Sequence, residues 1–144
     1  MSRVLHSLSP TKIRNQHRRT VAEILRRMMK KQEVDAETKD MASMLVFILL
    51  ELQEGVEKSV EAWEKRGYWM KAERFLRQWD WTKAAAANLD DVIRHEAWDL
   101  IPELMMELVP HFADIDVKSF TRKPSTWQGA HAKLLEKPAL DLPY

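Results

Sequence analysis

Apolar side chains recur at three- and four-residue spacing along most of this chain, which is the spacing of one side of an α-helix. In residues 10–32 that side is formed by Ile13, His17, Val21, Ile24 and Met28. The 144 residues include only 3 Gly and 6 Pro, and no Cys. Many short strands joined by tight turns are therefore disfavoured, and disulfide bonds and Cys-ligated metals are excluded. The spacing predicts an all-α fold.

Capping residues and helix breakers divide the chain into four expected helices with antiparallel neighbours, a four-helix bundle-like domain over residues 1–113. Ser9 followed by Pro10 predicts the start of the first helix, and Asp35 and Gly67 predict the start and the end of the second. Thr38 occupies the capping-box position but is not the Glu or Gln that normally completes the box. We expect the four helices at residues 10–32, 36–66, 68–94 and 98–112.

Residues 114–144 are expected to form a partly extended C-terminal tail, because the apolar pattern weakens there and three Pro interrupt it. One short helix is predicted near its middle, capped by Ser125 or Thr126 and ending at about Glu136. Two alternatives stay open for the tail. It wraps the bundle with Phe120 and Trp127 as anchors, or it is mobile.

Charge is divided unevenly along the sequence, although the formal net charge is only +1. Residues 1–32 hold nine Lys and Arg and a single acid, Glu23, whereas residues 33–144 hold 14 basic and 21 acidic residues. The first helix is thus basic, and it could bind nucleic-acid phosphates or a protein partner, or pair with the acidic face of the second helix. The helix carries Arg14, Arg18, Arg19, Arg26 and Arg27, and the acidic face carries Glu51, Glu54, Glu57, Glu61 and Glu64.

Tryptophan is unusually frequent, with six residues in the chain and five of them between positions 63 and 98. Within residues 68–81 the aromatic side chains alternate with Lys71, Arg74 and Arg77. Trp79 and Trp81 are two residues apart, which is about 200° of helical rotation, so one of the two is expected to face away from the core. Such a surface fits a protein-interaction hot spot, a stacking platform for single-stranded nucleic acid, a flat apolar ligand or pigment, or simply a Trp-rich core.

Motifs for catalysis, metals and cofactors are missing from the sequence. The three Gly stand at positions 55, 67 and 129, too far apart for a phosphate-binding loop. No Glu-x-x-His or His-Glu-x-x-His motif occurs, whereas a Ser/His/Asp triad has no fixed spacing and is not tested by this absence. We expect no enzyme and no cofactor. Residues 1–10 lack the apolar region of a signal peptide, and the longest uncharged apolar run, residues 44–50, is shorter than a membrane span, so a cytoplasmic protein is expected.

Two short stretches carry a family resemblance. Residues 14–20, Arg-Asn-Gln-His-Arg-Arg-Thr, and residues 68–75, Tyr-Trp-Met-Lys-Ala-Glu-Arg-Phe, followed by Trp79 and Trp81, resemble small uncharacterised all-helical proteins of cyanobacteria. The resemblance covers about residues 10–115 and leaves the tail outside. It implies a protein of a photosynthetic bacterial cytoplasm, near pigment–protein assembly, and it brings no activity and no site residues.

These observations lead to one main hypothesis and two alternatives. The main hypothesis is a non-enzymatic interaction or assembly-factor protein that holds a protein partner or a second copy of itself, as in a dimer. The alternatives are sequence-independent nucleic-acid binding and binding of a flat apolar ligand or pigment. The expected partner-binding residues are Arg14, Arg18, Arg19, Arg26, Arg27, Lys71, Arg74, Arg77, Trp79 and Trp81.

Overall fold

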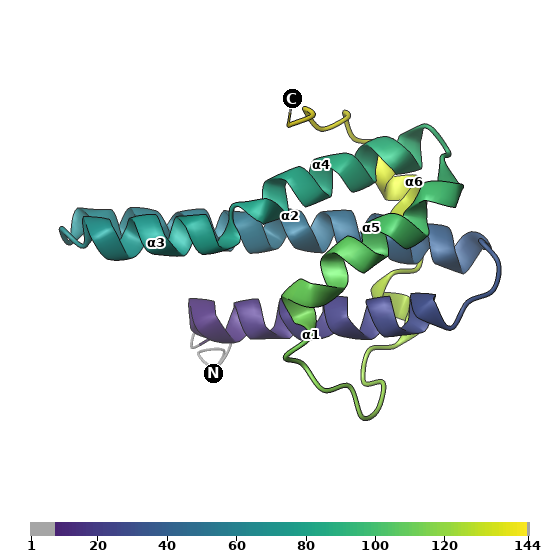
Figure 1. Cartoon of the computed structure of the whole chain (residues 1–144), viewed down its shortest axis with the longest axis horizontal. Helices are drawn as coiled ribbons and strands as arrows, with labels where there is room; N and C mark the ends of the chain where they lie inside the picture. The colour runs from purple at the N-terminus through teal and green to yellow at the C-terminus, as the bar shows by residue number, and fades with distance from the viewer. Residues whose placement is uncertain (1–7, 144) are drawn as a thin grey trace, which may run out of the picture.

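The computed structural model describes residues 8–143 and is helical without any strand in that range, which confirms the all-α class. Its α-helices are α1 (Pro10–Met29), α2 (Ala36–Lys65), α3 (Trp69–Trp79), α4 (Trp81–Arg94), α5 (Ile101–Leu108) and α6 (Ala130–Leu135). Short 3-10 turns are η2 (Trp98–Leu100), η3 (Val109–Phe112) and η4 (Pro124–Thr126). Figure 1 shows α1 and α2 running antiparallel, with α3 returning along α2 and α4 continuing beyond it.

The predicted caps begin both long helices. The Ser9 hydroxyl accepts a hydrogen bond from the Lys12 N–H at 3.1 Å. At α2 the Asp35 carboxylate accepts from the Thr38 N–H at 2.9 Å, while the Asp35 N–H donates to the Thr38 hydroxyl at 3.4 Å. The expectation that Thr38 leaves the capping box incomplete is therefore wrong, because a hydroxyl fills the acceptor role of the usual Glu or Gln.

The chain reverses direction tightly between α2 and α3. Gly67 has φ of +84°, a conformation that favours glycine, and its N–H donates to the Glu64 carbonyl at 2.9 Å. The next N–H, that of Tyr68, donates to the Trp63 carbonyl at 2.9 Å, so the two bonds form a Schellman motif. The outer part of α2 and the whole of α3, residues 52–79, form a two-helix arm that projects beyond the first turn of α1 (Figure 1).

The single helix predicted over residues 68–94 is instead two helices that meet at Asp80. The Thr82 hydroxyl donates to the Trp79 carbonyl at 2.8 Å and stabilises this junction. The bend lets Trp79 and Trp81 stack on each other, with ring centroids 6.1 Å apart, instead of pointing in opposite directions. The prediction that one of them faces away from the core is therefore wrong. Trp79 is 9% exposed, and Trp81 packs against the core.

The first and the fourth predicted helices are also shorter than expected. The first ends at Met29, three residues before the predicted end. The predicted helix over residues 98–112 is α-helical only in α5 and has 3-10 turns on both sides. Pro102 lies in the first turn of α5, where its missing N–H costs little, and Pro110 lies in η3, just beyond the α-helical hydrogen bonding.

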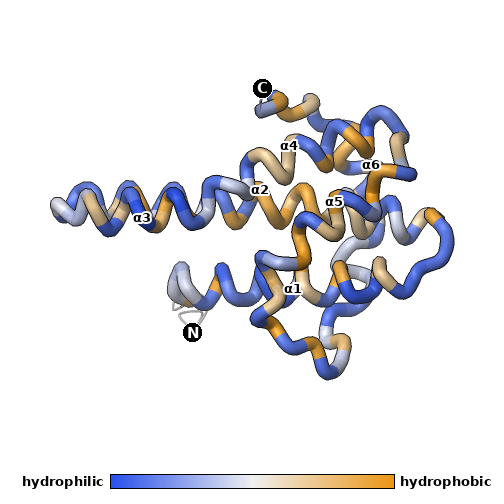
Figure 2. Tube along the Cα trace, in the orientation of Figure 1, coloured by the Kyte–Doolittle hydropathy of each residue, from blue (hydrophilic) through white to orange (hydrophobic). Residues whose placement is uncertain are grey.

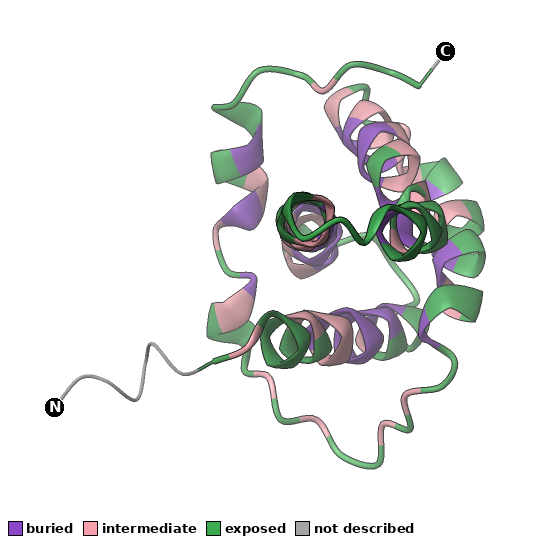
Figure 3. Ribbon diagram, turned by 90° about the vertical axis from the view of Figure 1, so that its left-hand side faces the viewer, coloured by how far each residue is buried: buried purple, intermediate pink, exposed green. Residues whose placement is uncertain are grey.

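The inner half of α2 is the centre of the core. Met41, Leu45 and Leu49 are fully buried there, and α2 contacts α1, α3, α4 and α6. Figure 3 shows α2 nearly end-on with the other helices around it, and Figure 2 shows hydrophobic residues concentrated in its inner half, whereas the arm is mainly hydrophilic. The arm is thus joined to the core through α2, which belongs to both. No other element within residues 8–143 covers the far end of the arm.

The C-terminal segment wraps the bundle, which is the first of the two alternatives for the tail. Trp127 is 1% exposed and joins the same core as α1 and α2, as does Leu134 of α6. The Arg27 guanidinium lies over the Phe120 ring, 4.4 Å from the centroid of that ring. Asp40 of α2 accepts hydrogen bonds from the N–H groups of Gly129 and His131. The tail and the bundle therefore form one packed body.

Candidate functional site: the arm tip and the groove beside it

Four of the five arginines predicted as a binding surface on α1 contact the chain itself. Arg18 forms two hydrogen bonds to the Asp114 carboxylate, at 2.6 and 3.1 Å, and Arg19 donates to the carbonyls of Asp116 and Ser119. These bonds hold the segment that follows η3 against α1. The Arg18 guanidinium also lowers the pKa of Asp114 from its ordinary value.

Glu23 also takes part in the contact between α1 and the C-terminal segment. In the sequence it stood out only as the one acid among nine cations. It is fully buried and accepts hydrogen bonds from Arg19, from the Thr121 N–H and hydroxyl, and from the Arg122 N–H, at 2.6–2.8 Å. Burial by itself raises the pKa of this carboxyl, but these donors outweigh it and lower the pKa to about 2. The basic helix therefore binds the C-terminal segment of the same chain.

The remaining arginines of α1 stack on aromatic rings, with one exception. Arg14 lies 4.8 Å from the centroid of Phe75, and its burial, with the charge of Arg18, lowers its pKa. Arg27 lies over Phe120 and Trp127. Arg26 is exposed and forms no hydrogen bond or ion pair within residues 8–143. Whether this face binds a partner stays a prediction, but little of its charge is free to do so.

The predicted aromatic and basic residues of the third expected helix, which lie on α3 and α4, separate into two groups. Trp79 and Trp81 belong to a ring stack against the core, in which the ring centroids of Trp81 and His111 lie 3.6 Å apart. Burial lowers the pKa of this imidazole. Arg77 pairs with Glu73 of its own helix at 2.6 Å. These residues therefore do not form a common surface with the rest of the set.

Lys71 and Arg74 lie instead at the far end of the arm, beside three apolar residues that the sequence reasoning did not select. Tyr68 is 52% exposed, Trp69 is 62% exposed and Met70 is 70% exposed. We call residues 67–71 with Arg74 the arm tip. The signal was present in the sequence: Gly67 ends one helix and starts a hairpin, and the first turn after a hairpin that projects from the body has nothing to cover it.

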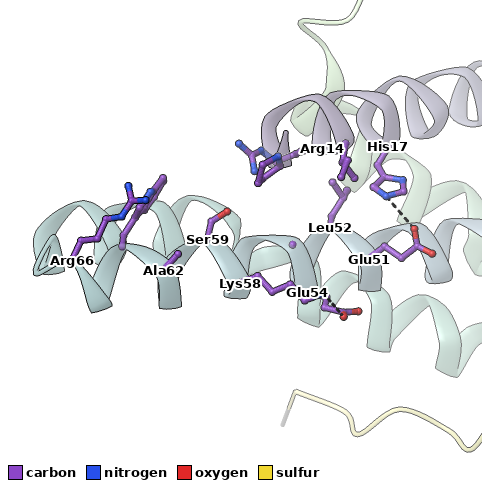
Figure 4. Close-up of a pocket in the computed structure, with 13 residues that line it drawn as sticks. Arg14, His17, Glu51, Leu52, Glu54, Lys58, Ser59, Ala62 and Arg66 are labelled. Carbon is purple, nitrogen blue, oxygen red and sulfur yellow. Dashed lines mark ion pairs between the residues drawn. The ribbon is translucent and has the colours of Figure 1, made fainter. Parts of the chain in front are cut away.

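A groove of about 600 Å³ lies beside the arm, between the first turns of α1 and the outer part of α2 (Figure 4). Its apolar lining is formed by Ile13, Leu52, Gly55, Ala62 and Trp63. At its inner end His17 Nε2 lies 3.1 Å from Glu51 Oε2, and Glu54 pairs with Lys58 at 3.2 Å. We expected ion pairs between α1 and the acidic face of α2. In the described part of the chain, the contact between His17 and Glu51 is the only one of them that forms.

The arm tip and the groove offer apolar area bordered by charge, which suits docking of a macromolecule. Within residues 8–143 no three His, Asp or Glu side chains come together as metal ligands. Over the same residues, no helix has both the length and the apolarity needed to cross a bilayer. Comparison of the chain with protein-family models, curated proteins and solved structures finds no match.

Proposed function

We propose that this chain is a non-enzymatic interaction protein that docks a partner protein on the arm tip. One observation carries the proposal: Tyr68, Trp69 and Met70 are exposed side by side at the end of a projecting arm. Adjacent exposed apolar side chains of this size are uncommon on a surface that has no partner.

The charges around the tip define the kind of partner. Residues 65–71 contain Lys65, Arg66 and Lys71 and no acid, and Arg74 follows one turn later. Lys65 pairs weakly with Glu61, since both side chains are largely exposed. The surface that fits this tip therefore has an apolar pocket for Trp69 and Met70 and acidic side chains at its rim.

The construction of the arm favours docking without rearrangement. The Schellman motif fixes the turn at Gly67, and Phe75 packs edge-on against Trp63 with ring centroids 4.9 Å apart. Lys71 lies over the Trp63 ring at 4.5 Å. A rigid presentation of the anchors lowers the entropy cost of association, so a small surface can still bind specifically.

A paired capture experiment tests the proposal. Wild-type chain and the double variant Trp69→Ala, Met70→Ala are immobilised and exposed to lysate of the source organism, with Met106→Ala as the matched control. Met106 is 64% exposed on α5, outside the arm. We expect a protein retained by the wild type and the control but lost by the double variant. Once purified, it should bind the double variant at least about tenfold more weakly by calorimetry. Equal binding of the double variant would contradict the proposal.

Nucleic-acid binding, pigment binding and the cytoplasmic location stay predictions. A labelled oligonucleotide distinguishes the first of these from protein docking. Binding that weakens steeply between low and moderate salt indicates phosphate contacts. Absence of binding at low salt eliminates that alternative.

A further inference from the structure

The groove beside the arm exists because α2 and α3 extend past the first turn of α1. Figure 1 shows this overhang, and Figure 4 shows that the side chains from Glu51 to Arg66 on one side of α2 border the open space. Ile13 is 41% exposed at the inner end of the groove, and Tyr68 is 52% exposed beyond its outer end. Beyond the first turns of α1, one face of a long helix is thus left without a partner from residues 8–143.

Gly55 lies on this face, about one turn from Glu51, and no contact within residues 8–143 of the single chain requires it to be glycine. A Cβ built on it meets nothing within 4 Å, so no neighbouring group of the fold requires glycine. Glycine within a helix is unfavourable relative to alanine, and its helical φ does not require it either. The absence of a side chain is useful where another backbone approaches closely. Ser59 and Ala62 keep the same face small toward the outer end of the groove.

The residues of this face are arranged symmetrically about a point between Lys58 and Ser59. Gly55 and Ala62 lie at equal distances from that point, and so do Glu51 and Arg66. If two copies of this helix run antiparallel about that point, each Gly55 meets Ala62 of the other copy. Each Glu51 then meets Arg66 of the other copy, so opposite charges lie at both ends of the pairing.

We propose that the groove is the docking site of a second copy of this chain, with the two arms antiparallel about a twofold axis near Ser59. Each arm then lies in the groove of the other copy, and its end reaches the first turns of α1 there. Arg66 forms no ion pair within residues 8–143, and the Glu51 side chain is 55% exposed although it contacts His17, so both charges are accessible. A twofold interface of this kind is closed and uses the same residues on both copies.

This inference does not rest on the proposed function of the arm tip. Trp69 and Met70 belong to the arm tip, and neither of them lines the groove. We therefore expect both side chains to stay accessible in the dimer. A chain that dimerises and still captures a partner, or does only one of these, separates the two proposals.

Exchange of charges tests the register. We expect Glu51→Arg alone and Arg66→Glu alone each to raise the dimer dissociation constant at least about tenfold in sedimentation equilibrium, because each places like charges together twice. The double variant Glu51→Arg, Arg66→Glu should return to within about threefold of the wild type. Circular dichroism verifies that the variants fold. A double variant no better than the single variants would overturn the register.

Two further variants test the closeness of the helices. A Cβ at residue 55 meets nothing within 4 Å in the single chain, so we expect Gly55→Leu to fold and yet be monomeric. Ser59→Cys should form a disulfide-linked dimer on mild oxidation, because the two copies of residue 59 lie next to the axis, and the chain has no other Cys to react. Met106→Cys, on α5, is the control and should stay monomeric. A wild-type chain that is monomeric up to about 1 mM, with no cross-link at Ser59→Cys, overturns the proposal and leaves a different occupant for the groove.

Discussion

The carboxylate of Glu23, in the middle of α1, accepts hydrogen bonds from both the N–H and the hydroxyl of Thr121, 98 residues further along the chain. This is the point at which the C-terminal segment is fastened to the bundle. Arg19 supplies the opposite charge at 2.7 Å, so the buried carboxylate is both paired and fully hydrogen-bonded. The stability of the wrapped form should therefore depend strongly on this single acid.

Replacing Glu23 with Gln keeps its size but removes the charge that four donors share. We expect the free energy of unfolding to fall by about 2–3 kcal/mol, since hydrogen bonds to a charged group are strong and a buried donor loses its partner. Urea denaturation followed by circular dichroism measures this change. Glu103→Gln, at an exposed position of α5, is the control and should change stability by less than about 0.5 kcal/mol. Equal effects of the two substitutions would show that the Glu23 contact is not stabilising.

The pKa of Glu23 also predicts how stability depends on pH. The folded state lowers this pKa from 4.5 to about 2, so the unfolded chain binds the proton more readily. The contribution of Glu23 is thus complete above about pH 5 and is lost as the pH falls from 4.5 toward 2. The shift corresponds to about 3 kcal/mol. Denaturation series between pH 7 and pH 2 should show a smaller loss for Glu23→Gln than for the wild type over this window, and parallel curves would contradict the assignment.

The helices of this fold could be predicted from sequence because their signals are local. Ser9, Asp35 and Gly67 act on hydrogen bonds within four or five residues, so the starts of α1 and α2 and the end of α2 follow from neighbouring residues alone. The break at Asp80 could not be predicted in this way. Trp81 is drawn toward His111, whose position depends on the packing of another helix.

The candidate site was predicted less well for the same reason. The positive charge of α1 was apparent from composition, but its destination lies about 100 residues away along the chain, in the backbone around Asp116 and Ser119. Exposure of Trp69 depends on how far the arm projects beyond α1, a tertiary relationship that helical periodicity does not contain. Of the two Trp selected in its place, Trp79 is buried and Trp81 is partly buried against the core.

The different surroundings of two tryptophans give a direct comparison. Trp81 packs against Trp79, His111 and Phe112, so Trp81→Ala should lower the free energy of unfolding by about 2–3 kcal/mol. Trp69→Ala removes a side chain that is 62% exposed and should change stability by less than about 0.5 kcal/mol. Urea denaturation of both variants checks this. A stable Trp81→Ala variant would mean that this ring is not part of the core.

Two glycines of the arm should respond in opposite ways to the same substitution. Gly55 is within α2, where an added Cβ lies in open space, so Gly55→Ala should stabilise the monomer by about 1 kcal/mol through helix propensity. Gly67 has φ of +84°, so Gly67→Ala should destabilise by about 1–2 kcal/mol although its Cβ also meets nothing within 4 Å. Thermal denaturation at about 1 μM chain, low enough to keep a weak dimer dissociated, measures both. If Gly55→Ala were destabilising there, glycine would be required by the fold of the single chain, and the argument for a closely packed second copy would lose its basis.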